Sequence, residues 1–129
     1  MKTIEKTLPI LARILIALIF VLSGASKIAS FDGTVGYIAS KGLPLASIAA
    51  VMAIIVELGG GLMLVFAYRA RLAAFLLAGF TVVAAFIFHN FWAMPADEMQ
   101  NQMIHFMKNL ALAGGLLMVV VHGASAKAE

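Results

Sequence analysis

Four long apolar stretches follow one another along the chain and are separated by short polar segments. Each stretch has the length, about 20 residues, that an α-helix needs to cross the hydrocarbon core of a bilayer. Between the first two, Phe31, Val35 and Ile38 recur at helical spacing. This spacing predicts a short amphipathic helix lying on the membrane surface. The predicted spans are residues 9–28, 43–68, 72–94 and 103–122.

Proline, glycine and arginine mark the expected ends of these helices. Pro44 follows Gly42-Leu43 and suits the first turn of the second span, where a missing backbone N–H leaves no bond unmade. The segment Arg69-Ala70-Arg71 predicts a tight polar turn between the second and third spans. Pro95 disfavours helix at Met94 and is expected to end the third span there.

The composition agrees with a membrane protein. Hydrophobic residues make up 64% of the 129-residue chain, charged residues make up 12%, and the mean hydropathy is +1.06. A soluble domain of this size could not bury so much apolar surface. We therefore expect an all-α integral membrane four-helix bundle, forming one domain over residues 1–129, with the surface helix between spans 1 and 2.

Charge and cysteine content exclude several functions. The chain has no cysteine, so thiol relays, iron–sulfur clusters and cysteine-based zinc sites are excluded. The net charge of +3 is scattered among helix ends and offers no basic stripe for nucleic acid. Because basic residues of short loops favour the cytoplasmic side, both termini are expected to be cytoplasmic. Lys2, Lys6, Arg69, Arg71 and Lys127 lie on that side, whereas Lys41, Asp32, Asp97 and Glu98 lie on the other.

Glu57 is the most unusual residue of the second span. At a rise of ~1.5 Å per residue it lies ~21 Å from Leu43 and ~16 Å from Tyr68, near the middle of the membrane. A carboxylate at this depth costs at least ~2.5 kcal/mol and requires a partner or a function. Arg13, Lys27 and Lys108 are the candidate partners, and Arg13 and Lys108 are favoured because their depths bracket the midplane.

Polar residues of the other spans fall on defined faces. Arg13, Ala17, Phe20, Gly24 and Lys27 share one face of the first helix, which should point into the bundle. In the fourth helix, Gln102, His105, Lys108, Asn109 and Ala113 form a similar stripe, at the depth of His89 and Asn90. We expect Lys27, His89, His105, Lys108 and Asn109 to line a cavity open toward the outer leaflet, with Glu57 at its floor and residues 31–40 as a lid. The predicted polar network is Arg13, Lys27, Glu57, His89, His105, Lys108 and Asn109.

Several interpretations of these residues remain open. Glu57 can form a structural ion pair, or it can handle protons or bind a ligand. Lys27 can extend to the interface instead of pairing. His89 and His105 can be hydrogen-bonded interface residues or two axial haem ligands. The small residues of three segments suggest close contact between helices: Gly59-Gly60-Gly61, Gly114-Gly115, and the series Ala70, Ala74 and Ala78.

A series of short motifs runs along the chain in a fixed order. They are Arg13, Ser23-Gly24, Lys27, Phe31-Asp32-Gly33-Thr34, Gly42-Leu43-Pro44, Glu57-Leu58-Gly59-Gly60, Arg69, His89-Asn90-Phe91-Trp92, Phe106-Met107-Lys108-Asn109 and Gly114-Gly115-Leu116. This set resembles the DoxX family of membrane proteins, over nearly the whole chain. The resemblance implies a four-span protein of the bacterial cytoplasmic membrane, and the family's polar positions correspond to Arg13, Lys27, Glu57, His89, Lys108 and Asn109. Some relatives are subunits of quinone-reducing, sulfur-oxidising enzymes, which implies an oxidoreductase association.

Two classes of function follow. In the first, the protein is a redox-associated subunit whose outer polar groups bind a quinone or another small amphiphile, while Glu57 relays protons. In the second, it is a non-catalytic scaffold or chaperone that docks a redox partner protein, or a second copy, through its helix faces. An exporter of cations is disfavoured, because basic residues share the core with Glu57. No metal-ion site is expected and no catalytic residue is assigned. Of the two cofactors considered, quinone is favoured over haem.

Overall fold

The computed structural model describes residues 1–123, and the expected all-α membrane fold is confirmed. Four stretches are long and apolar enough to cross a membrane, namely Lys2–Ala29, Ala46–Val65, Ala70–Ala93 and Ala96–His122. The second contains a π-helical segment, η1, and the third ends in a short 3-10 helix, η2. The elements are α1 (Lys2–Ala29), α2 (Phe31–Ser40), α3 (Ala46–Ile54), η1 (Ile55–Gly59), α4 (Gly60–Val65), α5 (Ala70–Phe88), η2 (Phe91–Ala93) and α6 (Ala96–His122).

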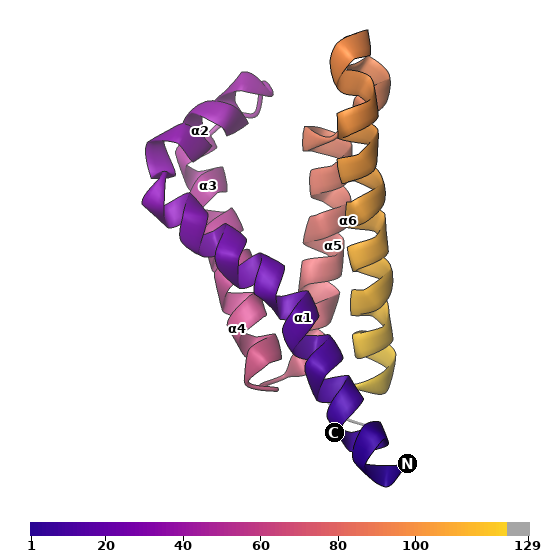
Figure 1. Ribbon diagram of the computed structural model, residues 1–129. Coiled ribbons are helices and arrows are strands. Elements are labelled where there is room, and N and C mark those ends of the chain that lie inside the picture. Colours follow the sequence, from indigo (N-terminus) through magenta and orange to yellow (C-terminus); the bar gives the residue numbers. More distant parts are fainter. Residues whose placement is uncertain (124–129) are drawn as a thin grey trace.

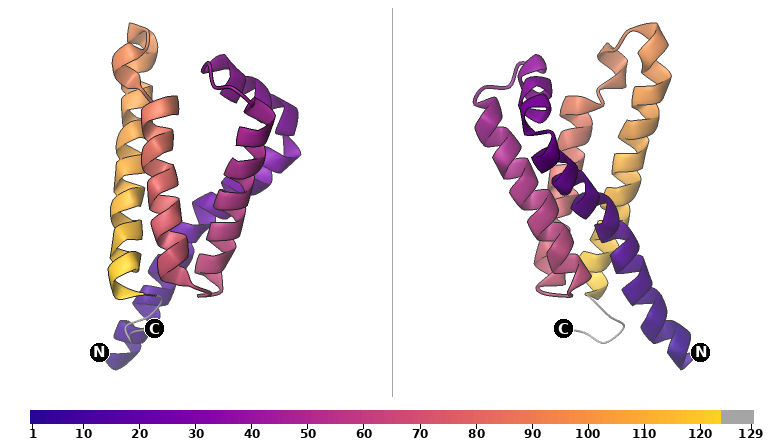
Figure 2. Two further views of the ribbon diagram at one scale, coloured as in Figure 1. Left: turned by 180° about the vertical axis from the view of Figure 1, so that it is seen from behind. Right: turned by 60° about the vertical axis from the view of Figure 1, so that its left-hand side comes forward.

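The helices form two arms that meet at one end and separate at the other (Figures 1 and 2). One arm contains α3, η1 and α4, and the other contains α5 and α6. Helix α1 crosses obliquely from the end where the arms meet to the first arm, where α2 lies at the separated end (Figure 1). The start of α1 and the last turn of α6 lie at the same end, as an even number of spans requires.

The end where the arms meet contains the hydrophobic core, which is rich in small residues. Ala70, Ala73 and Ala74 at the start of α5 are fully buried, beside Leu64 of α4 and Leu77. A Cβ added to Gly60 would lie 2.9 Å from Leu77 Cγ, which is closer than real side chains approach. Small side chains therefore let α4 and α5 pack closely, which supplies attraction where lipid provides no hydrophobic drive.

The glycine segments contribute unequally to this packing. A Cβ added to Gly61 would lie 2.9 Å from Val21 Cγ2 of α1, and one on Gly115 would lie 3.3 Å from Ile16 Cδ1. Nothing lies within 4 Å of the corresponding position on Gly59 or Gly114. The expectation of close helix contact thus holds for Gly60, Gly61 and Gly115, and it is wrong for Gly59 and Gly114.

The first residues of α1 and α3 differ from the predicted starts of the first two spans. Helix α1 begins at Lys2, before Pro9, and continues through the proline. Helix α3 begins at Ala46 because Gly42 and Leu45 take positive φ angles of 79° and 52°. The hydrophobic pattern indicates which residues lie inside the bilayer. It does not indicate where a helix ends, because the helix can continue into the polar region beyond the bilayer.

The two remaining connections also differ from expectation. The turn between α4 and α5 spans residues 66–69, where Ala67 and Arg69 have φ angles of 57° and 46°, so Ala70 and Arg71 belong to α5. Helix α5 ends at Phe88, before the predicted limit at Met94. Helix α6 begins at Ala96, directly after Pro95. The surface helix α2 covers Phe31–Ser40, the segment in which it was predicted.

Candidate functional site

Glu57 lies in η1, where the second span changes from α-helical to π-helical geometry. Its residue surface is only 4% exposed. A π-helical turn accommodates one extra residue within an α-helix, and such turns occur frequently at functional sites. Here the wider turn carries the one carboxylate found at mid-membrane depth among residues 1–123.

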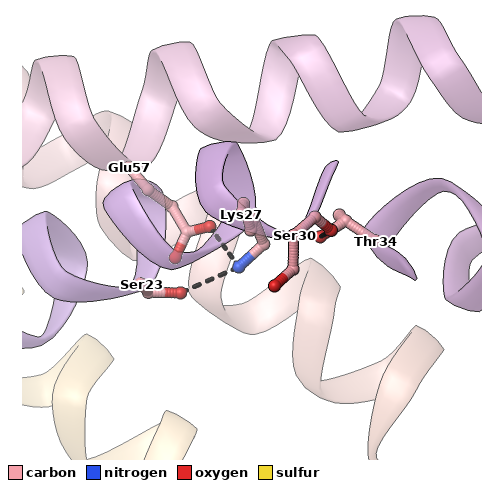
Figure 3. Close-up of polar contacts among 5 residues, drawn as sticks. All are labelled: Ser23, Lys27, Ser30, Thr34 and Glu57. Atoms are coloured by element: carbon pink, nitrogen blue, oxygen red, sulfur yellow. Dashed lines mark hydrogen bonds and ion pairs between the residues drawn. The ribbon is translucent and has the colours of Figure 1, made fainter. Parts of the chain in front are cut away.

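Lys27 of α1 forms an ion pair with Glu57. The Lys27 Nζ lies 2.6 Å from Glu57 Oε1 and donates a hydrogen bond to Ser23 Oγ at 2.8 Å (Figure 3). Ser30 and Thr34 lie nearby, and the Thr34 hydroxyl donates to the Ser30 carbonyl oxygen at 3.0 Å (Figure 3). The carboxylate and the ammonium therefore neutralise each other inside the bundle.

This pairing corrects the prediction that favoured Arg13 or Lys108 over Lys27. Helical side chains point back toward the N-terminus of their helix, so Lys27 extends from the C-terminal end of α1 toward the middle of the membrane. The close packing of α1 on η1 also brings the two residues together, since a Cβ on Gly24 would lie 2.9 Å from Leu58 Cβ. The depth estimate from helix rise alone ignored both effects.

Arg13 lies deeper in the bundle, among the core residues of α1. It is 7% exposed, and Ala17, Phe20 and Gly24 of the predicted inward face are buried with it. Its Nε donates a hydrogen bond to the Leu64 carbonyl oxygen at 2.5 Å. Because Leu64 is in the last turn of α4, this cation meets the partially negative C-terminal end of a helix.

A cavity of about 590 Å³ lies between the two arms, directly above the ion pair. Ser23, Lys27 and Glu57 line it from one side, and Thr81, His89 and Asn109 line it from the other. Most of the remaining wall is apolar and comes from α1, α2, α3, α5, α6 and the loop before α3. Its apolar residues include Ile19, Phe20, Ile38, Leu43, Ala49, Ala53, Phe80, Ala84, Ile87 and Leu112.

Helix α2 covers this cavity at the end where the two arms separate (Figure 1). Gly33, Thr34, Tyr37 and Ile38 line it from above. The ring of Tyr37 stacks on Phe88, at the end of α5, with centroids 5.4 Å apart. This contact joins the two arms across the outer end of the cavity. Partial burial raises the pKa of the Tyr37 phenol above its ordinary value, which already keeps the hydroxyl neutral near pH 7 and able to donate a hydrogen bond.

The α5–α6 side of the cavity is held by side-chain hydrogen bonds. The His89 Nδ1 lies 2.8 Å from Gln102 Oε1, and Asn109 Nδ2 donates to the Thr81 carbonyl oxygen at 3.3 Å. The His105 ring stacks on His89 with centroids 5.1 Å apart and planes 25° apart, and it does not line the cavity. Stacked rings turn their faces to each other, which does not fit two ligands on opposite sides of a haem iron. Within residues 1–123, no three acidic or histidine side chains gather to hold a metal ion.

Lys108 lies apart from the other predicted network residues. It is exposed, and it lines a second, shallow groove between α1 and α6 with Ile16, Ile19, Ala111, Leu112 and Gly115. The predicted network is thus divided: Lys27, Glu57, His89 and Asn109 share the cavity, and His105 lies behind His89. Arg13 belongs to the core below, and Lys108 faces outward.

Five polar residues of the cavity were not part of the predicted polar network, namely Ser23, Ser30, Thr34, Tyr37 and Thr81. Ser23 could have been found, because it precedes Lys27 by one helical turn and such pairs face each other. Thr81 lies inside an apolar span, where a single threonine carries no recognisable signal. Its position became evident only from the packing of α5 on α6.

These features define a four-span helical membrane protein with a buried ion pair beside an intramembrane cavity. The chain belongs to the DoxX family, whose sequence model matches residues 8–90, and the resemblance noted in the sequence is confirmed. It is 37% identical over 117 residues to inner membrane protein YphA of Escherichia coli K12, covering 91% of this chain and 84% of that protein. It is 35% identical over 126 residues to inner membrane protein YqjF of the same organism, covering 98% and 92%. No solved structure matches the chain.

Proposed function

We propose that this chain is an inner-membrane protein that binds a small neutral amphiphile with a hydrogen-bonding ring, such as a quinone, in the cavity between its arms. The main support for the proposal is the Lys27–Glu57 pair on the wall of a mostly apolar cavity. Ligand sites typically combine apolar walls with a few convergent polar groups, and a volume of about 590 Å³ lies within their usual range. The names of both relatives support the inner-membrane location.

The charge of the cavity favours a neutral head group. Lys27 and Glu57 cancel each other, so neither an anion nor a cation gains a net opposite charge. The Lys27 ammonium has three N–H donors, of which two are directed at Glu57 and Ser23, and the third can bind a carbonyl oxygen. The second carboxylate oxygen of Glu57 can accept from a hydroxyl. Quinone and quinol forms need a donor and an acceptor of this kind.

His89 adds a second acceptor on the opposite wall. With Gln102 Oε1 as its acceptor, His89 Nδ1 carries the proton, and Nε2 of the neutral ring is left as an acceptor. A ring lying between the arms would then contact Lys27 and Glu57 on one side and His89 on the other. This arrangement supports ligand binding, with Glu57 and His89 as the groups able to exchange protons with a reduced ligand.

Filling the cavity tests this proposal. Ala49 lines the cavity, so Ala49→Phe should reduce retention of a short-chain quinone at least about tenfold, equivalent to ~1.4 kcal/mol. Ala25 is an exposed residue of α1, and Ala25→Phe provides a control of equal bulk. Quinone bound to protein purified in mild detergent would be extracted and quantified by mass spectrometry.

The outcome separates the two functional classes. Equal quinone retention by the wild type and both variants would contradict the cavity site. Absence of quinone together with a partner protein purified in stoichiometric amount would instead favour the scaffold or chaperone function.

We also propose that both termini face the cytoplasm. Lys2, Lys6, Arg69 and Arg71 lie at the end of the bundle where α1 begins, and Lys127 lies outside the described residues. Since the chain has no cysteine, single cysteines at Lys2 and Asp97 can report the orientation. A membrane-impermeant maleimide added to intact cells should label the cysteine at 97 and spare the one at 2. The reverse pattern would refute the proposed orientation.

A further inference from the structure

Lys108 is a cation exposed within the membrane-spanning part of α6. The next residue, Asn109, donates a hydrogen bond to the Thr81 carbonyl oxygen of α5, so Lys108 lies at about the same membrane depth as Thr81. Thr81 lies seven residues before Phe88, the last residue of α5, which places this level ~10 Å inside the outer end of that helix. Even with its side chain extended outward, Lys108 holds its charge near or below the membrane interface.

The described part of the chain supplies no anion to neutralise Lys108. Glu57 is buried and already paired with Lys27 at 2.6 Å. The other acidic residues of the described chain, residues 1–123, lie in the first turns of α1, α2 and α6, namely Glu5, Asp32, Asp97 and Glu98. A single charge exposed to hydrocarbon is costly, so the partner of Lys108 comes from outside these residues.

The same inventory argues against a second copy of the chain as that partner. A copy packed against α6 would bring the same acids, with Glu57 buried in its own bundle and the others near its helix ends. None of them lies at the depth of Lys108. A lipid, by contrast, can place a single anionic group at the membrane interface and an apolar chain below it.

The groove beside Lys108 has this arrangement of charge and apolar surface. Ala111, Leu112 and Gly115 follow Lys108 along α6 toward the middle of the membrane, opposite Ile16 and Ile19 of α1. Its volume is about 380 Å³. The absence of a side chain on Gly115 keeps the floor open, because a Cβ there would lie 3.3 Å from Ile16 Cδ1. Thus the charge lies at the outer end and the apolar channel extends inward.

Aromatic side chains mark the interface at the same end. Trp92 of η2 lies with Phe86 and Phe106 in a cluster whose ring centroids are 5.2 to 5.9 Å apart. Tryptophan is enriched where the hydrocarbon core meets the head groups. Since Phe106 and Lys108 are two residues apart on α6, the ammonium can reach this level by extending outward.

We propose that the groove between α1 and α6 binds an anionic phospholipid of the outer leaflet, with its phosphate on Lys108 and one acyl chain along Ala111, Leu112 and Gly115. The groove adjoins the cavity through Ile19 and Leu112, but Lys108 does not line the cavity, so the proposal does not depend on quinone binding. It assigns Lys108 to lipid recognition on the outside of the bundle.

Competition between two lipids tests this site. Protein would be equilibrated with equal amounts of phosphatidylglycerol and phosphatidylcholine with identical acyl chains, and the first bound lipid would be identified by native mass spectrometry. The wild type should prefer phosphatidylglycerol about fivefold, the effect expected of one basic residue near the membrane surface. Lys108→Met should reduce this preference to parity, and Lys108→Arg should retain it.

Further variants distinguish a specific lipid-binding site from general electrostatic attraction of anionic lipid. Lys41→Met removes one positive charge at the same end of the molecule and should leave the preference unchanged. Ala111→Phe should lower binding of both lipids, whereas Ala25→Phe and the cavity variant Ala49→Phe should not. A preference that survives Lys108→Met, or that Lys41→Met reduces equally, would overturn the proposal.

Discussion

The two ends of the bundle are built in opposite ways. Where the arms meet, α4 and α5 pack through Gly60, Ala70, Ala73 and Ala74, and no space remains for another side chain. Where the arms separate, α3, η1, α5 and α6 line a cavity beside an ion pair, and the Tyr37–Phe88 contact joins α2 to the end of α5. Close packing at one end is therefore what permits an open, polar interior at the other.

Breaking the packed end should produce the largest effect. Gly60→Leu would place side-chain atoms where Leu77 already lies, and overpacking of this kind costs about 3 kcal/mol of unfolding free energy. Gly60→Ala should show a smaller loss of the same sign. The measurement is the unfolding free energy from denaturant titration in mixed micelles.

The adjacent residue provides the control for that experiment. Gly59 is in the same span, is exposed, and has nothing within 4 Å of an added Cβ. Gly59→Leu should therefore leave the stability nearly unchanged. If the two leucine variants lose equal stability, the contact between α4 and α5 is not what holds the arms together.

Breaking the ion pair at the open end should have a smaller and asymmetric effect. Lys27→Met leaves the Glu57 carboxylate buried without its cation and should cost about 2 kcal/mol, less than for a fully buried pair because the Lys27 side chain is 28% exposed. Glu57→Gln should cost less, because Lys27 can retain Ser23 and contact water in the cavity. Both are measured by the same titration.

The double variant measures the coupling energy between Lys27 and Glu57. Lys27→Met combined with Glu57→Gln removes both charges and should be more stable than Lys27→Met alone. Additive losses in the two single variants would show that the pair contributes no coupling energy. The structural importance assigned to Glu57 would then be wrong.

The sequence was sufficient for most of the fold because membrane helices have a strong and simple pattern. Apolar length located the four spans, and helical spacing identified α2 and the inward face of α1 from Arg13 to Gly24. It did not reveal the turns at Leu45 and Ala67, where nonglycine residues take positive φ angles. Such conformations are imposed by the packing of neighbouring helices and leave little trace in local composition.

The site was less predictable than the fold. Depth along each helix correctly placed Lys27, His89 and Asn109 near one level, but depth does not specify which way a helix is rotated or tilted. The π-helical turn at Ile55–Gly59 alters the rotation of Glu57 and of the residues after it in the second span, and α1 crosses the bundle obliquely (Figure 1), so Glu57 meets Lys27. The rotation of α6 places Lys108 outside the bundle.

The Lys27–Glu57 pair also bears on how the chain enters the bilayer during synthesis. Glu57 alone would make insertion of the second span less favourable by about 2.5–3.5 kcal/mol at the helix centre, and Lys27 adds a smaller penalty near the end of the first. The two residues belong to consecutive spans, joined by α2 and a short loop. If the spans leave the translocon together as a hairpin, the charges can meet before either faces lipid. We therefore expect the first two spans to insert as a unit.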